Sequence, residues 1–234
     1  MTVWAQKRFW KTAGFSEVDD GFRIELDGRP IATPAKRSLI VPTDTIAARI
    51  AGEWQSQVGR VDPASMPWTR SANAALDKVA LQREETEKHL AGYAATDLVC
   101  YRATAPEALV RRQSETWDPI LDWASRQFGA RLEVARGVMP VAQETGAVSR
   151  LAEEMPPMSD FQLTGFHDMV TVSGSFLIAL ASAYGADTPA NLFAASCLDE
   201  AWQTEQWGRD EEAEMAKNSR ESAFLHATEF FRTA

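Results

Sequence analysis

Adjacent carboxylates are the residues of this sequence with the clearest potential for chemistry. Asp199 is followed by Glu200, and Glu211 is followed by Glu212. Such pairs can act as general acid and base when a pocket surrounds them. The neighbouring sequence predicts no such pocket, and runs of charged residues usually form solvated helix faces. A hydrolase or metal enzyme that uses this acidic cluster of a C-terminal helix is therefore kept only as an alternative hypothesis for the function.

Other motifs of catalysis are missing from the sequence. It contains no Glu-x-x-His pattern of di-iron bundles, no His-Glu-x-x-His, no Gly-x-Gly-x-x-Gly and no Walker A loop. The serines Ser173 and Ser175 lie in an apolar stretch without the Gly-x-Ser-x-Gly elbow. The histidines are then expected to be structural or solvated residues: His89, His167 and His226.

The stretch LDGRPIATPAKRSLIVP, residues 26–42, raises the question of a phosphate-binding loop, because it joins a glycine to several basic residues. A phosphate loop needs glycines that open the backbone and a helix N-terminus directly behind them. Here Gly28 is the only glycine, and the next segment has the pattern of a strand. We interpret the stretch as turns between strands, and we expect neither nucleotide binding nor any other cofactor.

Charge and cysteine content narrow the class of protein further. The formal net charge is -9, which disfavours nucleic acid and anionic membranes as partners. Cys100 and Cys197 have no metal-binding spacing and are expected to be buried thiols in a reducing compartment. No secretory signal and no apolar run of roughly 20 residues is found. We therefore expect a cytoplasmic protein without membrane insertion.

The first 60 residues have a different pattern from the rest. The segment 22–26, FRIEL, alternates apolar and polar residues as a half-buried strand does, and Asp27-Gly28 is a strong hairpin signal. Prolines bound the short segments that follow. The sequence predicts a small antiparallel β unit, interrupted by a helix near 46–57, in an α+β protein. The expected domains are a β-rich N-terminal domain, residues 1–62, and an α-helical C-terminal domain, residues 63–234.

Helical periodicity and capping signals dominate after residue 42. Thr43 or Asp44 can cap the first helix, and Ser159 with Gln162 forms a capping box. Other expected helices extend over about 66–101, from Pro106 to a stop at Gly129, and from 159 to a stop at Gly185. The segment 131–138, RLEVARGV, is expected to be a short strand or an extended crossing. A last helix is expected from Thr188, as N-cap, through Pro189 and into the acidic segment near residue 216.

Two tryptophans have contrasting environments in these expected helices. Trp54 continues an apolar stripe with Ile46 and Ile50, which predicts a core position. On a wheel of residues 190–216, Trp202 falls on the apolar side, whereas Trp207 falls at the border of the polar side. A ring there either caps the core or is an exposed binding anchor of the kind found at interface hot spots.

Several motifs, in order along nearly the whole chain, resemble one known family. They are LDGRPIATPAK, IAGEWQSQ, MPWTRSANAALDKV, TDLVCYRA, WDPILDWA and LDEAWQTEQWG. Each is weak alone, but their succession is similar to that of the assembly chaperones of the F-type ATP synthase that handle the alpha subunit. The resemblance implies a β-rich N-terminal and a helical C-terminal domain, with neither catalysis nor a cofactor. It also implies binding of free alpha subunit, preventing aggregation until the beta subunit replaces the chaperone.

The resemblance also implies which residues carry the function and where the protein acts. In LDEAWQTEQWG it marks Asp199, Glu200 and Trp207 as part of a client-binding surface, to which we add Glu211. It also marks Trp54, which we expect to be structural or at the junction of the domains. Eukaryotic relatives belong to the mitochondrial matrix, whereas this chain lacks an Arg-rich presequence and is expected to be bacterial. A third hypothesis is a permanent structural subunit of the ATP synthase.

Overall fold

The computed structural model describes residues 7–137, 139 and 141–234 of the chain. The first six residues, which belong to the stretch searched for a secretory signal, lie outside the described residues. So does Val138, the last residue of the segment 131–138. Among the described residues, no helix combines the length and the apolar composition that crossing a lipid bilayer requires.

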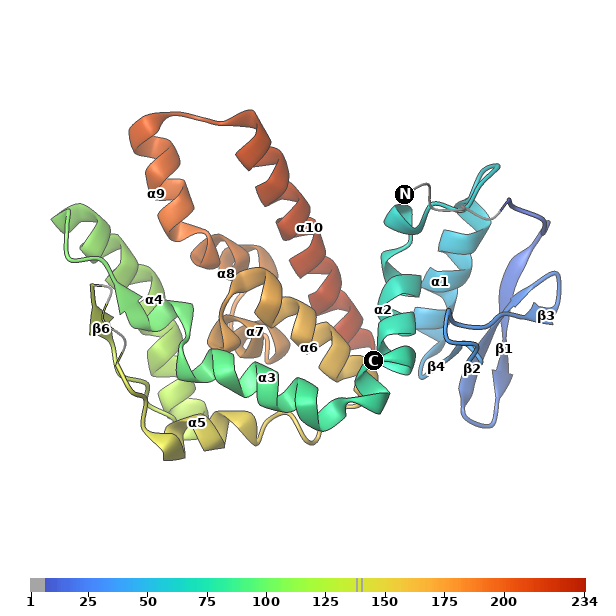
Figure 1. Cartoon of the computed structure of the whole chain (residues 1–234), viewed down its shortest axis with the longest axis horizontal. Helices are drawn as coiled ribbons and strands as arrows, with labels where there is room; N and C mark the ends of the chain where they lie inside the picture. Colours follow the sequence, from blue (N-terminus) through green and yellow to red (C-terminus); the bar gives the residue numbers. More distant parts are fainter. Residues whose placement is uncertain (1–6, 138, 140) are drawn as a thin grey trace. The chain divides into compact units, whose positions relative to one another are not determined.

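An antiparallel sheet forms near the N-terminus, with β2 as its hub (Figure 1). Its strands are β1 (Ala13–Val18), β2 (Gly21–Leu26), β3 (Arg29–Pro30) and β4 (Ile40–Val41). The predicted hairpin at Asp27-Gly28 joins β2 to β3, and both turn residues have positive φ, 49° and 74°. Tight two-residue hairpins favour this conformation, and glycine adopts it without strain.

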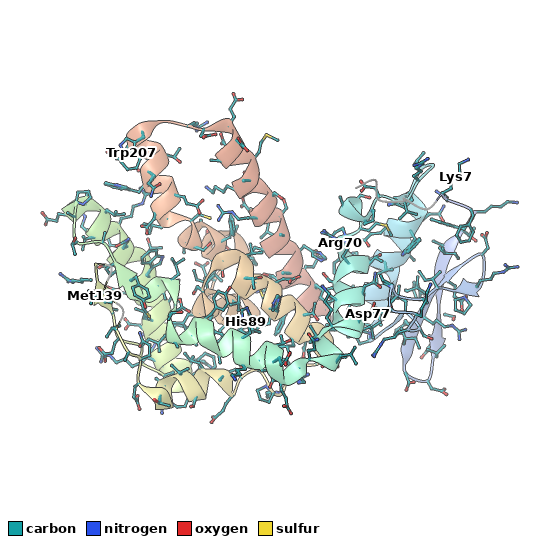
Figure 2. The ribbon with its side chains drawn as sticks, in the orientation of Figure 1. Lys7, Arg70, Asp77, His89, Met139 and Trp207 are labelled. Atoms are coloured by element: carbon teal, nitrogen blue, oxygen red, sulfur yellow. The ribbon has the colours of Figure 1, made fainter. Side chains whose placement is uncertain are left out.

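The basic stretch after β3 is a structural turn. The hydroxyl of Thr33 donates to Oδ1 of Asp77 at 2.6 Å, and the backbone N–H of Ala35 donates to its Oδ2 at 3.0 Å. Asp77 is the last residue of helix α2 (Pro67–Asp77), so one carboxylate ties the stretch to that helix (Figure 2). Lys36 has a φ of 68° at the tip of this turn. The interpretation as turns between strands is consistent with these contacts.

Helices make up most of the remaining chain (Figure 1). They are α1 (Asp44–Ser56), α2 (Pro67–Asp77), α3 (Arg83–Ala95), α4 (Glu107–Phe128), α5 (Thr145–Ala152), α6 (Asp160–Ser173), α7 (Phe176–Ala183), α8 (Pro189–Ser196), α9 (Leu198–Trp207) and α10 (Glu211–Thr233). Short 3-10 helices cover Pro63–Ser65, Val79–Leu81 and Leu98–Cys100, and two short strands, β5 (Tyr101–Arg102) and β6 (Ala135–Arg136), pair in parallel. A small sheet followed by helices confirms the α+β class.

Local capping signals predicted several helix ends correctly. The Thr43 hydroxyl accepts from the N–H of Ile46 at the start of α1. The N–H of Ser159 donates to the side chain of Gln162, and the N–H of Gln162 donates back to the Ser159 hydroxyl, both at 3.0 Å. Gly129 ends α4 with a φ of 64°. At Thr43 and at the Ser159–Gln162 pair, side chains satisfy free backbone N–H groups of a helix N-terminus, whereas Gly129 ends its helix by adopting the left-handed conformation.

Three helices expected to be continuous are broken. The stretch 66–101 divides into α2, α3 and 3-10 turns. Gly174, with a φ of 71°, separates α6 from α7, and the Ser175 hydroxyl then caps α7. Gly208, with a φ of 95°, ends α9, and Asp210 accepts from the N–H groups of Glu212 and Ala213 as α10 begins. Hydrophobic periodicity continued through each break and concealed it.

By their internal contacts the residues fall into two compact units. Unit 1 comprises residues 1–83, 159–165 and 229–234, and unit 2 comprises residues 84–158 and 166–228. The core of unit 1 collects buried side chains from the sheet, the helices behind it and the end of α10: Ile24, Leu39, Val41, Ile46, Ile50, Trp68 and Phe230. The expected division of domains at residue 62 stays a prediction.

Candidate functional site

A cleft of about 660 Å³ in unit 2 is lined by α9, the beginning of α4 and the segment 101–106. Cavities of several hundred Å³ with a few converging polar groups are the usual form of a binding site. The lining contains aromatic rings, amide side chains, one arginine, Arg102, and one carboxylate, that of Asp199. The family-derived expectation for α9 therefore coincides with a concave surface.

Asp199 is held in position by a buried amide. The backbone N–H of Ala103 donates to Oε1 of Gln113 at 2.8 Å, and Nε2 of Gln113 donates to Oδ1 of Asp199 at 2.7 Å. Gln113 lies on α4 and is almost fully buried. Asp199 lies in the first turn of α9, where the helix dipole favours a negative charge. Three separate segments thus fix one carboxylate at the cleft.

The aromatic part of the lining consists of Tyr101, Trp202 and Trp207. Trp207 is 80% exposed, at the end of α9 remote from α8 (Figure 2). Trp202, five residues earlier on the same helix, is half-buried rather than part of the core. The helical wheel places it on the apolar side, and its partial burial is compatible with that position. The exposed ring of Trp207 rules out a role as a buried core residue.

Ion pairs attach α9 to two neighbouring helices. Nη1 of Arg112 on α4 lies 2.8 Å and 2.7 Å from the two carboxylate oxygens of Glu205. This hydrogen-bonded guanidinium holds the pKa of Glu205 below its usual range. On the other side, Arg220 of α10 makes a bidentate pair with Glu200. A carboxylate–guanidinium pair of this geometry fixes orientation as well as distance.

The predicted acidic cluster is divided between different surroundings. Asp199 lines the cleft, whereas the carboxylate of Glu200 is bound to Arg220. Glu211 begins α10, on the far side of the break at Gly208, and is exposed. Placing Trp207 and Glu211 on one helical wheel was therefore wrong. Among the residues that the structure describes, no group of three or more histidine, cysteine or acidic side chains is placed to hold a metal ion.

Trp54 lies in unit 1 and takes no part in the cleft. It packs partly buried against the core of that unit and meets the ring of Trp10 edge-on at 5.2 Å between ring centroids. The indole nitrogens of both rings are buried without a hydrogen-bond partner among the described residues. Its role at a domain junction stays a prediction.

Several residues of the site were not found by inspecting the sequence. Tyr101 and the backbone of 101–106 precede α9 by about a hundred residues, and Gln113 looked like an ordinary polar helix residue. One signal was available for Trp202, because the spacing of five residues between Trp202 and Trp207 places the rings about 140° apart on a helix. Two rings separated by this angle lie at the two edges of one helix face, and they need not both enter a core.

A family model described as ATP12 chaperone protein matches residues 7–125, which is half of the chain. The chain belongs to the ATP12 chaperone family. This membership confirms the resemblance to assembly chaperones of the F-type ATP synthase. The matched range includes the 101–106 side of the cleft and the start of α4.

Two solved structures extend the similarity to α9. Atp12 from Paracoccus denitrificans is 43% identical, with a TM-score of 0.93, and the match covers 97% of both chains. The Atu1473 protein of Agrobacterium tumefaciens, a chaperone candidate, is 38% identical with a TM-score of 0.90, over 96% of this chain and 85% of that one. The mitochondrial atp12 protein of Schizosaccharomyces pombe is 25% identical over 224 residues, or 91% of this chain and 77% of that protein.

Proposed function

We propose that this protein binds the free alpha subunit of the F-type ATP synthase and prevents its aggregation until the beta subunit replaces it. The binding surface is the α9 cleft, with Asp199 and Trp207 in contact with the client. Glu200 supports the surface by holding α9 to Arg220, and Glu211 extends it along the exposed start of α10. The protein acts without catalysis or a cofactor, in the cytoplasm of a bacterium.

The exposure of Trp207 is the observation that carries this proposal. Burial of a large apolar side chain stabilises a protein by about 1.5–3 kcal/mol, a gain that an exposed ring forgoes in the free protein. Single exposed apolar residues are common and need no explanation. Here, however, Trp207 lines the same cleft as Trp202 and Tyr101, beside a positioned carboxylate. Tryptophan and tyrosine are enriched among the hot spots of protein interfaces.

The client chemistry fits a surface of this kind. An alpha subunit without its beta neighbours exposes a large interface, and such interfaces aggregate readily. A holder needs to cover only part of that interface, since the beta subunit then displaces it by burying more area. The net charge of -9 keeps the holder soluble and attracts basic regions of a client.

The direct test is suppression of alpha-subunit aggregation, followed by light scattering while denatured alpha subunit is diluted into buffer. We expect stoichiometric amounts of the wild-type protein to suppress scattering, and added beta subunit to release the alpha subunit. Trp207→Ala should raise the half-maximal concentration about 30-fold, which corresponds to about 2 kcal/mol for a hot-spot ring. No suppression by the wild-type protein would refute the function.

Phe9→Ala is the matched control, because Phe9 is an aromatic residue of unit 1 with 67% exposure. It should suppress aggregation like the wild type. Equal losses in both variants would mean that any exposed aromatic ring serves, and would exclude the α9 cleft as the specific site. Thermal melting of each variant separates loss of binding from loss of fold.

A further inference from the structure

The α9 cleft has an uncompensated carboxylate between aromatic rings. Asp199 accepts one hydrogen bond from the neutral amide of Gln113, and no cation pairs with it among the described residues. Three arginines of the neighbouring segments are already engaged, each with a different carboxylate: Arg102 with Asp118, Arg112 with Glu205 and Arg220 with Glu200. A carboxylate that has no cationic partner within the chain attracts a cation from outside it.

The protein itself shows which cation suits such surroundings. The guanidinium of Arg102 lies 4.9 Å from the ring centre of Trp117 and donates to Oδ1 of Asp118 at 2.7 Å. One arginine side chain thereby satisfies an indole face and a carboxylate together. The cleft, whose lining includes the engaged Arg102, presents the same two kinds of group again, the carboxylate of Asp199 and indole rings.

We propose that the α9 cleft is a receptor for an arginine side chain carried by an extended segment of the client. Asp199 accepts hydrogen bonds from the guanidinium, and Trp202 and Trp207 supply the aromatic faces on which it stacks. This inference rests on the proposed function and names the chemical feature by which the alpha subunit is recognised.

Arginine fits these groups better than lysine for two physical reasons. Its planar guanidinium stacks on aromatic faces and directs several N–H groups at a carboxylate, whereas an ammonium is a compact, strongly hydrated charge. The amides of Gln203 and Gln206 also line the cleft and can bind the backbone on either side of the arginine. A volume of about 660 Å³ leaves room for those flanking residues.

The experiment titrates the protein with three small probes and follows the tryptophan indole N–H signals by NMR. The probes are N-acetyl-arginine amide, its lysine counterpart and its citrulline counterpart, which keeps the shape of arginine without the charge. The signals are assigned with Trp202→Phe and Trp207→Phe variants. We expect the arginine probe to shift both signals saturably, the lysine probe to bind about ten-fold more weakly, and the citrulline probe to leave them unshifted.

Two variants make the result decisive. Asp199→Asn retains an oxygen that can accept from Gln113 and removes the charge, so it should weaken arginine binding at least about ten-fold. Asp122→Asn on the exposed face of α4 loses the same charge outside the cleft and should bind like wild type. Equal shifts by all three probes, or undiminished arginine binding by Asp199→Asn, would overturn the proposal.

Alpha-subunit protection measured on the same samples separates this inference from the proposed function. Protection by the wild type that the arginine probe competitively reduces supports both. Protection that persists fully in Asp199→Asn, with no response to the arginine probe, overturns the receptor and leaves the chaperone function standing. Absence of protection by the wild type refutes the chaperone function, and with it the assignment of the alpha subunit as the source of the arginine.

Discussion

The carboxylate of Glu200 and the guanidinium of Arg220 form a bidentate ion pair that joins α9 to α10. The adjacent Asp199 is turned to the cleft and bound to Gln113 on α4 instead. Two neighbouring acids of one motif therefore have separate tasks. Glu200 holds α9 to α10, whereas Asp199 lines the cleft, where we propose that it meets a partner.

This division predicts the outcome of reversing the charge of Glu200 and of exchanging the charges of Glu200 and Arg220. Glu200→Lys places an ammonium beside Arg220 and should weaken both the α9–α10 contact and protection of the alpha subunit. The cost in stability should be only about 1 kcal/mol, since both side chains are partly exposed. Combining Glu200→Arg with Arg220→Glu should restore the pair and the protection. If the swap restores melting temperature but not protection, Glu200 itself contacts the client.

The amide of Gln113 should matter for stability as well as for the cleft. Gln113→Leu keeps the volume but leaves the N–H of Ala103 and Oδ1 of Asp199 without their bonds. We expect a loss of about 1–3 kcal/mol in the free energy of unfolding, measured by urea denaturation. Gln127→Leu, at an exposed position of the same helix, is the control and should change stability by less than about 0.5 kcal/mol. Equal stability of the two variants would show that the amide bridge contributes nothing.

Asp97 should make stability depend on pH in the acidic range. Its carboxylate is fully buried in unit 2, and burial raises its pKa to about 6. Hydrogen bonds from the Ser175 hydroxyl and the N–H groups of Leu177 and Val99 offset only part of this effect. Between pH 4 and pH 6 the folded state binds the proton more tightly than the unfolded state, so this residue's contribution falls as pH rises. It is constant above that window.

Across this window the contribution of Asp97 to the free energy of unfolding changes by about 3 kcal/mol. The pKa of Asp97 differs by about two between the folded and unfolded states, and each pKa unit corresponds to about 1.36 kcal/mol. Urea denaturation between pH 4 and pH 7 measures it, as the difference between wild type and Asp97→Asn. The advantage of the wild type over that variant should be larger at pH 4 than at pH 7. A difference that is independent of pH would contradict this prediction.

Phe230 should be essential to unit 1. It is fully buried and packs against Trp68 and Phe161, with ring centroids 5.7 Å and 6.1 Å away. Phe230→Ala should cost about 3–5 kcal/mol in the free energy of unfolding. The adjacent Phe231 is only half-buried, and Phe231→Ala should cost clearly less in the same denaturation experiment. Equal costs would argue against the assignment of Phe230 to the core.

Local signals in the sequence predicted local structure well. The turn at Asp27-Gly28 and the cap at Thr43 depend on residues within four positions of each other, so their chemistry is visible in the sequence. The break at Gly208 was missed because an isolated glycine is tolerated inside a helical pattern, and the acidic residues beyond it continue that pattern. The wheel that joined Trp207 to Glu211 failed for this reason.

The cleft depends on contacts between distant parts of the chain. Gln113 and Asp199 are 86 positions apart, and Arg112 and Glu205 are 93 apart. Periodicity places each residue on a helix face but gives no pairing between helices. The family motifs indicated α9 as functional, whereas the opposite wall at 101–106 became visible only once the chain was folded.

Because Phe230 belongs to the core of unit 1, that core cannot be completed until the end of the chain has been synthesised. Unit 1 takes most of its residues from the first 83, yet residues 229–234 complete its core, and the Thr43 hydroxyl donates to the carbonyl of Thr233 at 2.9 Å. A ribosome that adds roughly 5–20 residues per second needs roughly 7–30 seconds to proceed from residue 83 to residue 230. During that time the nascent unit 1 exposes the apolar surface that Phe230 later covers. We therefore expect this chain to be prone to aggregation until its translation reaches the end of α10.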